Sequence, residues 1–127
     1  MKREISLYVK DILEAMDKAK MFIESMSYED FLTDDKTKYA VVRCLEIIGE
    51  STKNIPDAIK KKYKEIPWRS MAGMRDKVSH FYFGIDYEKV WLAVKKDIPR
   101  LKPLIEKVPA DLPPSSPLNK GGKRGDA

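Results

Sequence analysis

The sequence is poor in two of the residue types from which active sites are commonly built. Among its 127 residues it has one cysteine, Cys44, and one histidine, His80. A single cysteine excludes an intrachain disulfide, so nothing indicates an oxidising compartment. A single histidine excludes a metal site made of several histidines of one chain. We therefore expect neither a metal nor a cofactor.

Long apolar runs are lacking as well. No stretch approaches the roughly 20 consecutive apolar residues that a membrane-spanning helix needs. The first residues lead directly into an amphipathic pattern, without the apolar core of a signal peptide. We expect a cytoplasmic protein that does not associate with membranes.

The net charge of +5 is distributed unevenly. Between residues 57 and 77 the chain has seven basic and three acidic residues. The basic ones are Lys60, Lys61, Lys62, Lys64, Arg69, Arg75 and Lys77. Such a stretch favours the approach of a polyanion such as RNA. The lysines at 60–64 fit a solvated helix face equally well.

Helical periodicity covers most of the chain. Residues 3–25 repeat apolar positions at steps of three and four, and residues 36–53 are apolar on more than one side, as in the central helix of a bundle. The apolar positions of the first segment are Ile5, Tyr8, Ile12, Ala15, Ala19, Phe22 and Met26. Thr33, Asp34 and Asp35 supply side chains that can cap the helix at 36–53. Shorter helices are expected near residues 57–63 and 68–79.

A last long helix is expected after a break at Gly84, with Asp86 as its N-cap. Pro99 and Pro103 should kink or restart this helix, because each removes a backbone donor. No strand pattern is present, so we predict an all-α fold: an up-and-down bundle of four to five helices within residues 1–108. Residues 109–127, rich in proline, glycine and basic residues, are predicted to form a disordered tail.

Three charged residues form a line on the central helix. Arg43, Glu46 and Glu50 are spaced by three and four, so they share a face. They are either an ion pair on the surface or a charged stripe that supports an active site. The spacing leaves both interpretations open.

The residues best suited to chemistry are Arg75, His80 and Tyr82, in the pattern RxxxxHxY. A histidine can act as acid or base near neutral pH, and an arginine can hold a phosphate. On a continuous helix, residues five apart are separated by about 140°. Arg75 and His80 therefore converge only if the helix ends near residues 78–79. His80 and Tyr82 point the same way if the following segment is extended.

RNA cleavage is a reaction that such a pocket could perform. It needs a base for the 2′-hydroxyl, an acid for the leaving 5′-oxygen and a cation for the phosphorane charge. Arg75 suits the cation, whereas His80 could be the base or the acid but not both at once. A two-fold dimer would supply the second imidazole. A lone histidine at a helix end is more often a structural residue, and spacing alone does not decide between the two.

The stretch 66–101 begins with Ile-Pro-Trp, contains the RxxxxHxY motif and continues through Ile-Asp to Val-Trp. Residues 46–50 read Glu-Ile-Ile-Gly-Glu. Together these two segments resemble the HEPN-domain toxins of the HepT type. The resemblance implies an all-α homodimer with a composite cleft, acting as a metal-independent endoribonuclease toxin of a type VII-like toxin–antitoxin pair. It also implies a nucleotidyltransferase antitoxin that transfers AMP to the motif tyrosine.

By position, the resemblance implies that Arg75 and His80 are catalytic and that Tyr82 is the AMPylated residue. Asp76 would help to orient His80. Phe81 departs from the small or polar residue expected between the histidine and the tyrosine. Two alternatives stay open: a non-catalytic helical partner of a nucleotidyltransferase, which would dock to it or bind nucleotide, and a plain dimerisation module.

Overall fold

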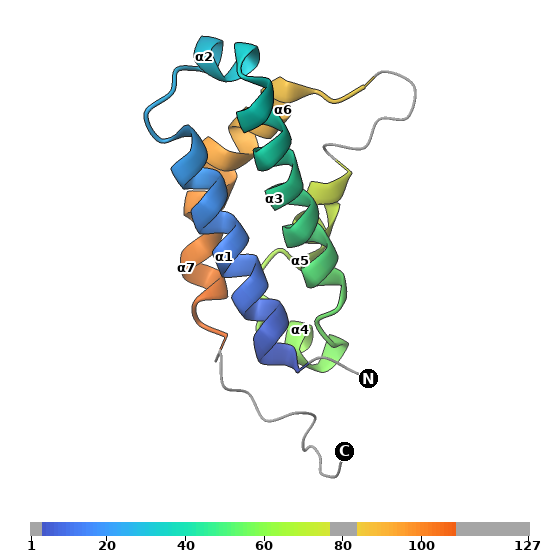
Figure 1. Ribbon diagram of the computed structural model, residues 1–127. Helices are drawn as coiled ribbons and strands as arrows, with labels where there is room; N and C mark the ends of the chain where they lie inside the picture. Colours follow the sequence, from blue (N-terminus) through green and yellow to red (C-terminus); the bar gives the residue numbers. More distant parts are fainter. Residues whose placement is uncertain (1–3, 77–83, 109–127) are drawn as a thin grey trace.

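A computed structural model of the protein describes residues 4–76 and 84–108, and these residues form helices joined by short turns (Figure 1). The elements are α1 (Ile5–Ile23), α2 (Tyr28–Thr33), α3 (Asp35–Lys53), α4 (Asp57–Lys62), α5 (Trp68–Ala72), the 3₁₀ turn η1 (Gly73–Arg75), α6 (Tyr87–Leu92), the π-helical segment η2 (Ala93–Asp97) and α7 (Ile98–Ile105). No strand occurs in this part of the chain, which confirms the all-α prediction.

The chain runs up and down along one axis. α1 and α3 run in opposite directions beside each other, α5 climbs back, and α6 with η2 and α7 descends behind them (Figure 1). α3 is the central element, because it contacts α1, α2, α5, η1 and α6. Its place explains why residues 36–53 are apolar on more than one side.

The core lies where α1, α3 and the α6–α7 rod meet. Burial of these apolar side chains is the main favourable contribution to the fold. Its fully buried members include Ile12, Met16, Ile23, Phe31, Leu45, Ile48, Met71, Met74, Ile98, Leu101 and Ile105. The predicted seam of α1 is right at Ile12, Ala15 and Ala19, but Ile5, Tyr8 and Phe22 are only half-buried. Because α1 packs against both α3 and α7, its buried residues also include Val9, Met16 and Ile23.

Two of the helices have the N-caps that the sequence predicts. Asp34 Oδ1 accepts a hydrogen bond from the Thr37 amide at 3.0 Å and caps α3, which lowers the pKa of this carboxyl. Asp86 caps α6 through the amides of Glu88 and Lys89. Just before it, Gly84 has φ +79°, a conformation that suits glycine.

The two prolines near the C-terminal end affect the last helix differently. The backbone stays helical from α6 through the π-helical segment η2 into α7, with Pro99 in the first turn of α7. Near Pro99 the helix therefore changes type, from π to α, and the chain is not interrupted there. Pro103 lies inside α7, which continues to Ile105. The predicted tail, 109–127, falls outside the described residues, so its disorder and the domain boundary stay predictions.

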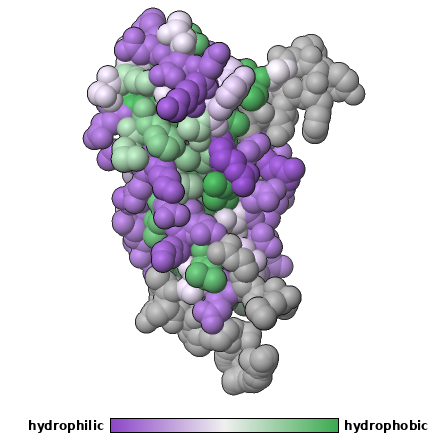
Figure 2. Space-filling view, viewed as in Figure 1, coloured by the Kyte–Doolittle hydropathy of each residue, from purple (hydrophilic) through white to green (hydrophobic). Residues whose placement is uncertain are grey.

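Figure 2 shows the face of the molecule that is turned to the viewer, where most of the described residues are hydrophilic. Hydrophobic residues gather over the upper part of α1 and α3 (Figure 2). Among the large apolar side chains that stay exposed are Met21, near the end of α1, and Tyr39, near the start of α3. None of the helices described is both long and apolar enough to span a bilayer.

Candidate active site

Arg75 is carried by a short segment that is anchored from its other side. Trp68 and Met71 of α5 and Met74 of η1 are buried in the core. The indole Nε1 of Trp68 also donates a hydrogen bond to the carbonyl of Tyr63 at 3.0 Å. With these groups fixed inward, Arg75 is left on the outside of the segment.

A glycine of α3 lets this segment come close to the central helix. A Cβ atom at Gly49 would lie 3.0 Å from the Ala72 carbonyl oxygen and 3.0 Å from both the amide nitrogen and the Cβ of Arg75. Few real Cβ atoms have neighbours so near, so the backbone at Arg75 packs where a side chain would otherwise stand. The sequence gives only a general sign of this close approach: a glycine inside an apolar helix often has a packing reason. It does not show which segment approaches Gly49.

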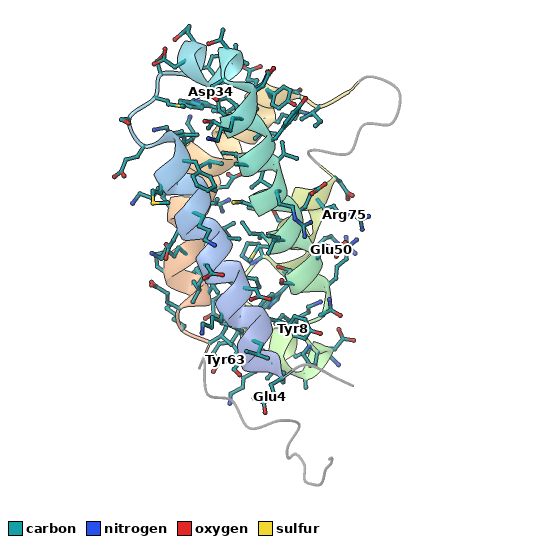
Figure 3. All side chains as sticks on the ribbon, viewed as in Figure 1. Glu4, Tyr8, Asp34, Glu50, Tyr63 and Arg75 are labelled. Carbon is teal, nitrogen blue, oxygen red and sulfur yellow. The ribbon has the colours of Figure 1, made fainter. Side chains whose placement is uncertain are left out.

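The side chain of Arg75 meets Glu50. Its Nη1 lies 3.4 Å from Glu50 Oε2, and both side chains extend outward on the same side of the bundle (Figure 3). About half of each remains exposed: 46% of Arg75 and 57% of Glu50. The guanidinium has five N–H donors, so a single contact of this kind leaves donors for another anion.

The three charged residues on α3 do not all act in the same way. The sequence left open a surface ion pair or a stripe that supports an active site, and the structure shows one contact of each kind. Arg43 Nη1 lies 3.6 Å from Glu46 Oε1, one turn further along the same helix, in an exposed ion pair. Glu50 instead reaches across to Arg75. One of the three residues therefore contacts the motif, and the other two form a surface pair.

The remaining motif residues are only partly within the described chain. Asp76 follows η1, is exposed and donates its amide hydrogen to the Gly73 carbonyl at 2.9 Å. His80 and Tyr82, with Lys77 and Phe81, lie outside the described residues, so the convergence of Arg75 with His80 and Tyr82 stays a prediction. Of the helix expected over 68–79, the structure shows an α-helix to Ala72 and a 3₁₀ turn to Arg75.

The basic residues predicted to attract RNA precede Arg75 along the chain. Lys60, Lys61 and Lys62 belong to α4, Lys64 follows it, and Arg69 is in α5; all but the half-buried Lys60 are exposed. α4 lies at the lower end of the bundle in Figure 1, and Arg75 lies higher, beside α3 (Figure 3). The lysines of α4 therefore lie nearer one end of the molecule than Arg75 does.

Other chemistry-bearing groups lie apart from this site. Cys44 is 5% exposed, and burial raises the pKa of its thiol, so it is a poor nucleophile. Within residues 4–76 and 84–108, no three metal-ligating side chains form a cluster. Arg75 is thus the centre of the site as far as the described chain extends.

Comparison with known proteins decides the family. Residues 12–108, which include both Glu50 and the whole RxxxxHxY motif, match the model of the ribonuclease HepT-like family. The chain belongs to this family. The match confirms the resemblance to HepT-type HEPN domains that the motif residues indicated.

Individual HepT-like relatives are similar over most of their length. A protein of Thermococcus cleftensis named as a ribonuclease HepT is 52% identical over 108 residues, which cover 85% of this chain and 98% of that protein. Relatives named as RNases are 50% identical in Methanocaldococcus jannaschii (87% of this chain, 92% of the relative) and 39% identical in Caldanaerobacter subterraneus (80% and 90%). No solved structure matches the chain significantly.

Proposed function

We propose that this HepT-like protein is a metal-independent endoribonuclease toxin that cleaves RNA by transesterification at the RxxxxHxY motif. The observation that carries the proposal is the placement of Arg75. It stands exposed on a segment anchored by buried side chains, inside the region that matches a ribonuclease family. An exposed guanidinium with unused donors is suited to bind an RNA phosphate.

In the proposed reaction the 2′-hydroxyl attacks the adjacent phosphorus. A base removes the 2′-hydroxyl proton, the bond from phosphorus to the 5′-oxygen breaks, and an acid protonates the departing 5′-oxygen. The products are a 2′,3′-cyclic phosphate and a free 5′-hydroxyl. Arg75 stabilises the charge on the pentacoordinate phosphorane, and His80 is the base or the acid.

The proposal includes a homodimer, because one imidazole serves only one of the two proton transfers. A two-fold axis would bring a second copy of the motif, and with it a second His80, to the same cleft. Sedimentation of the purified protein tests this part directly. A monomer that cleaves RNA would contradict the composite cleft while leaving the ribonuclease activity intact.

Regulation by AMPylation completes the proposal. A nucleotidyltransferase antitoxin would direct the Tyr82 hydroxyl oxygen to the α-phosphorus of ATP, forming a phosphodiester bond and releasing pyrophosphate. AMP on Tyr82 would add bulk and negative charge where the RNA phosphate must bind. The exposed Lys61, Lys62, Lys64 and Arg69 would raise the local concentration of RNA, and with it the salt sensitivity of cleavage.

The test is cleavage of RNA by purified, unmodified protein in EDTA, compared with Arg75→Ala and His80→Ala. We expect cleavage in EDTA by the unsubstituted protein, loss of cleavage in both variants and products that end in a 2′,3′-cyclic phosphate. No cleavage by a folded protein whose intact mass shows unmodified Tyr82 would contradict the proposal. The chain would then be a non-catalytic partner of a nucleotidyltransferase.

A further inference from the structure

We infer that Glu50 is a positioning residue for Arg75, and that Gly49 sets how closely the main chain of Arg75 packs against α3. This inference rests on the proposed function and goes beyond it, since it assigns a role to two residues of α3 that do not themselves touch the reacting atoms. The side chain of Glu50 meets the Arg75 guanidinium, and the backbone of Gly49 meets the Arg75 main chain.

The backbone contact comes first. η1 is a single 3₁₀ turn, and its Arg75 amide nitrogen and Cβ occupy the space that a side chain at position 49 would need. The site of approach is therefore specified by the absence of one Cβ atom. An alanine at this position would push the turn outward by a few tenths of an ångström, and Arg75 would move with it.

The ion pair then restricts the arginine side chain. An arginine with no partner samples many rotamers, and ordering them costs free energy when the guanidinium has to meet the phosphorane in the transition state. Glu50 Oε2 holds Nη1 at 3.4 Å and so limits the guanidinium to orientations that face outward beside α3. The other guanidinium donors remain for the phosphate.

The same geometry predicts how the pair acts on the reaction. Glu50 places a negative charge next to the position proposed for the RNA phosphate, so it does not favour ground-state binding of the substrate. Its benefit must come from orientation, which is expressed when the phosphorane forms. Loss of Glu50 should therefore lower kcat and leave KM unchanged or lower.

The first experiment measures kcat and KM for RNA cleavage by Glu50→Ala and Glu50→Gln. Because the pair is exposed and has a single contact, we expect kcat to fall about three- to fivefold in Glu50→Ala, with no rise in KM. Glu50→Gln should restore part of the loss, since its uncharged amide oxygen can accept a hydrogen bond from the Arg75 guanidinium. An unchanged kcat in Glu50→Ala, or a loss that appears only as a higher KM, would overturn the inference.

A matched control separates positioning from stability. Asp17 Oδ1 and Lys102 Nζ form another ion pair between helices, at 2.6 Å and with 56% and 35% of the side chains exposed. Asp17→Asn removes the negative charge from a pair of similar exposure that lies between α1 and α7. It should leave kcat unchanged. A fall in kcat equal to that of Glu50→Ala would show that any loosening of the bundle lowers activity, and the inference would fail.

The backbone contact is tested by a pair of glycines. Gly49→Ala should lower kcat about tenfold, because Arg75 is displaced relative to the rest of the site. Gly73→Ala is the control, since a Cβ atom there meets nothing within 4 Å. Equal activity of the two variants would contradict the role of Gly49. Alanine favours the helix at position 49, so Gly49→Ala should remain folded, and its circular dichroism checks this.

Failure of this inference differs from failure of the proposed function. If the unsubstituted protein does not cleave RNA, the proposed function fails, and the inference that rests on it fails too. If the unsubstituted protein and Asp17→Asn cleave, Arg75→Ala does not, and both Glu50→Ala and Gly49→Ala match the unsubstituted protein, only the inference fails.

Discussion

The two long helices α1 and α3 and the short segment formed by α5 and η1 are attached to the molecule in different ways. α1 and α3 have 19 residues each and bury side chains from Val9 to Ile23 and from Val41 to Thr52. α5 and η1 together span Trp68 to Arg75 and are held by Trp68, Met71 and Met74. Yet this short segment carries the candidate catalytic arginine. The proposed chemistry is therefore centred on a segment that buries only a few side chains, whereas α1 and α3 bury many, and substitutions in the cores of the two regions should have different effects.

The largest effect on stability is expected in the long helices. Leu45 of α3 is fully buried, and Leu45→Ala would remove its methyl groups and leave a cavity in the core. We expect the free energy of unfolding to fall by about 2–5 kcal/mol. Urea denaturation followed by circular dichroism measures it. Tyr39→Ala on the same helix is the control, because Tyr39 is 66% exposed and its loss should change stability by less than about 0.5 kcal/mol.

A smaller and more local effect is expected in α5. Trp68→Phe keeps an aromatic ring but removes the N–H that donates to the Tyr63 carbonyl at 3.0 Å. The cost should be about 1 kcal/mol, close to the net value of one hydrogen bond. Amide hydrogen exchange should become faster in α5 and η1 and stay unchanged in α1 and α3.

The control for this variant is Trp91→Phe. Trp91 packs against Phe31 with ring centroids 5.3 Å apart, in the α6 region. Its substitution should leave exchange in α5 unaltered. If Trp68→Phe instead accelerates exchange throughout α3, the short segment is part of the same cooperative unit as the long helices, and the proposed separation is wrong.

The smallest effect concerns pH. Asp17 raises the pKa of Lys102, chiefly through their hydrogen bond and then through its charge. A raised pKa in the folded state means that the contribution to stability is present below the ordinary lysine value of 10.5 and is lost as the pH rises through the folded-state value. Above about pH 10.5 the unsubstituted protein should therefore lose stability more steeply than Asp17→Asn. Thermal unfolding at pH 8 to 11.5 checks this, and parallel curves would show that the pair contributes nothing.

The long helices and their ends could be predicted from the sequence because their signals are local. Apolar periodicity predicted α1 and α3, and Asp34, Gly84 and Asp86 were predicted to cap or break helices where they do. Each depends on side chains a few residues apart. The fold class followed from these signals.

The packing of the site could not be predicted in this way. Gly49 and Arg75 are distant in sequence, and only the tertiary structure shows that one makes room for the other. The spacing of Arg43, Glu46 and Glu50 showed a shared face but not which of them meets Arg75. Trp91 is half-buried and packs against Tyr28 and Phe31, which are distant in sequence. The roles of His80 and Tyr82 stay predictions.

Cys44 offers a built-in reporter for the difference between the two regions. It is the chain's only thiol, it is 5% exposed on α3, and Lys18 of α1 is close enough to affect its ionisation. A thiol reagent can therefore modify the protein at one position, and does so readily only when the packing around α3 opens. The labelling rate measures how often that opening occurs, without any introduced probe. Variants of the short segment that reduce RNA cleavage while Cys44 stays protected would have changed the site and left the bundle closed.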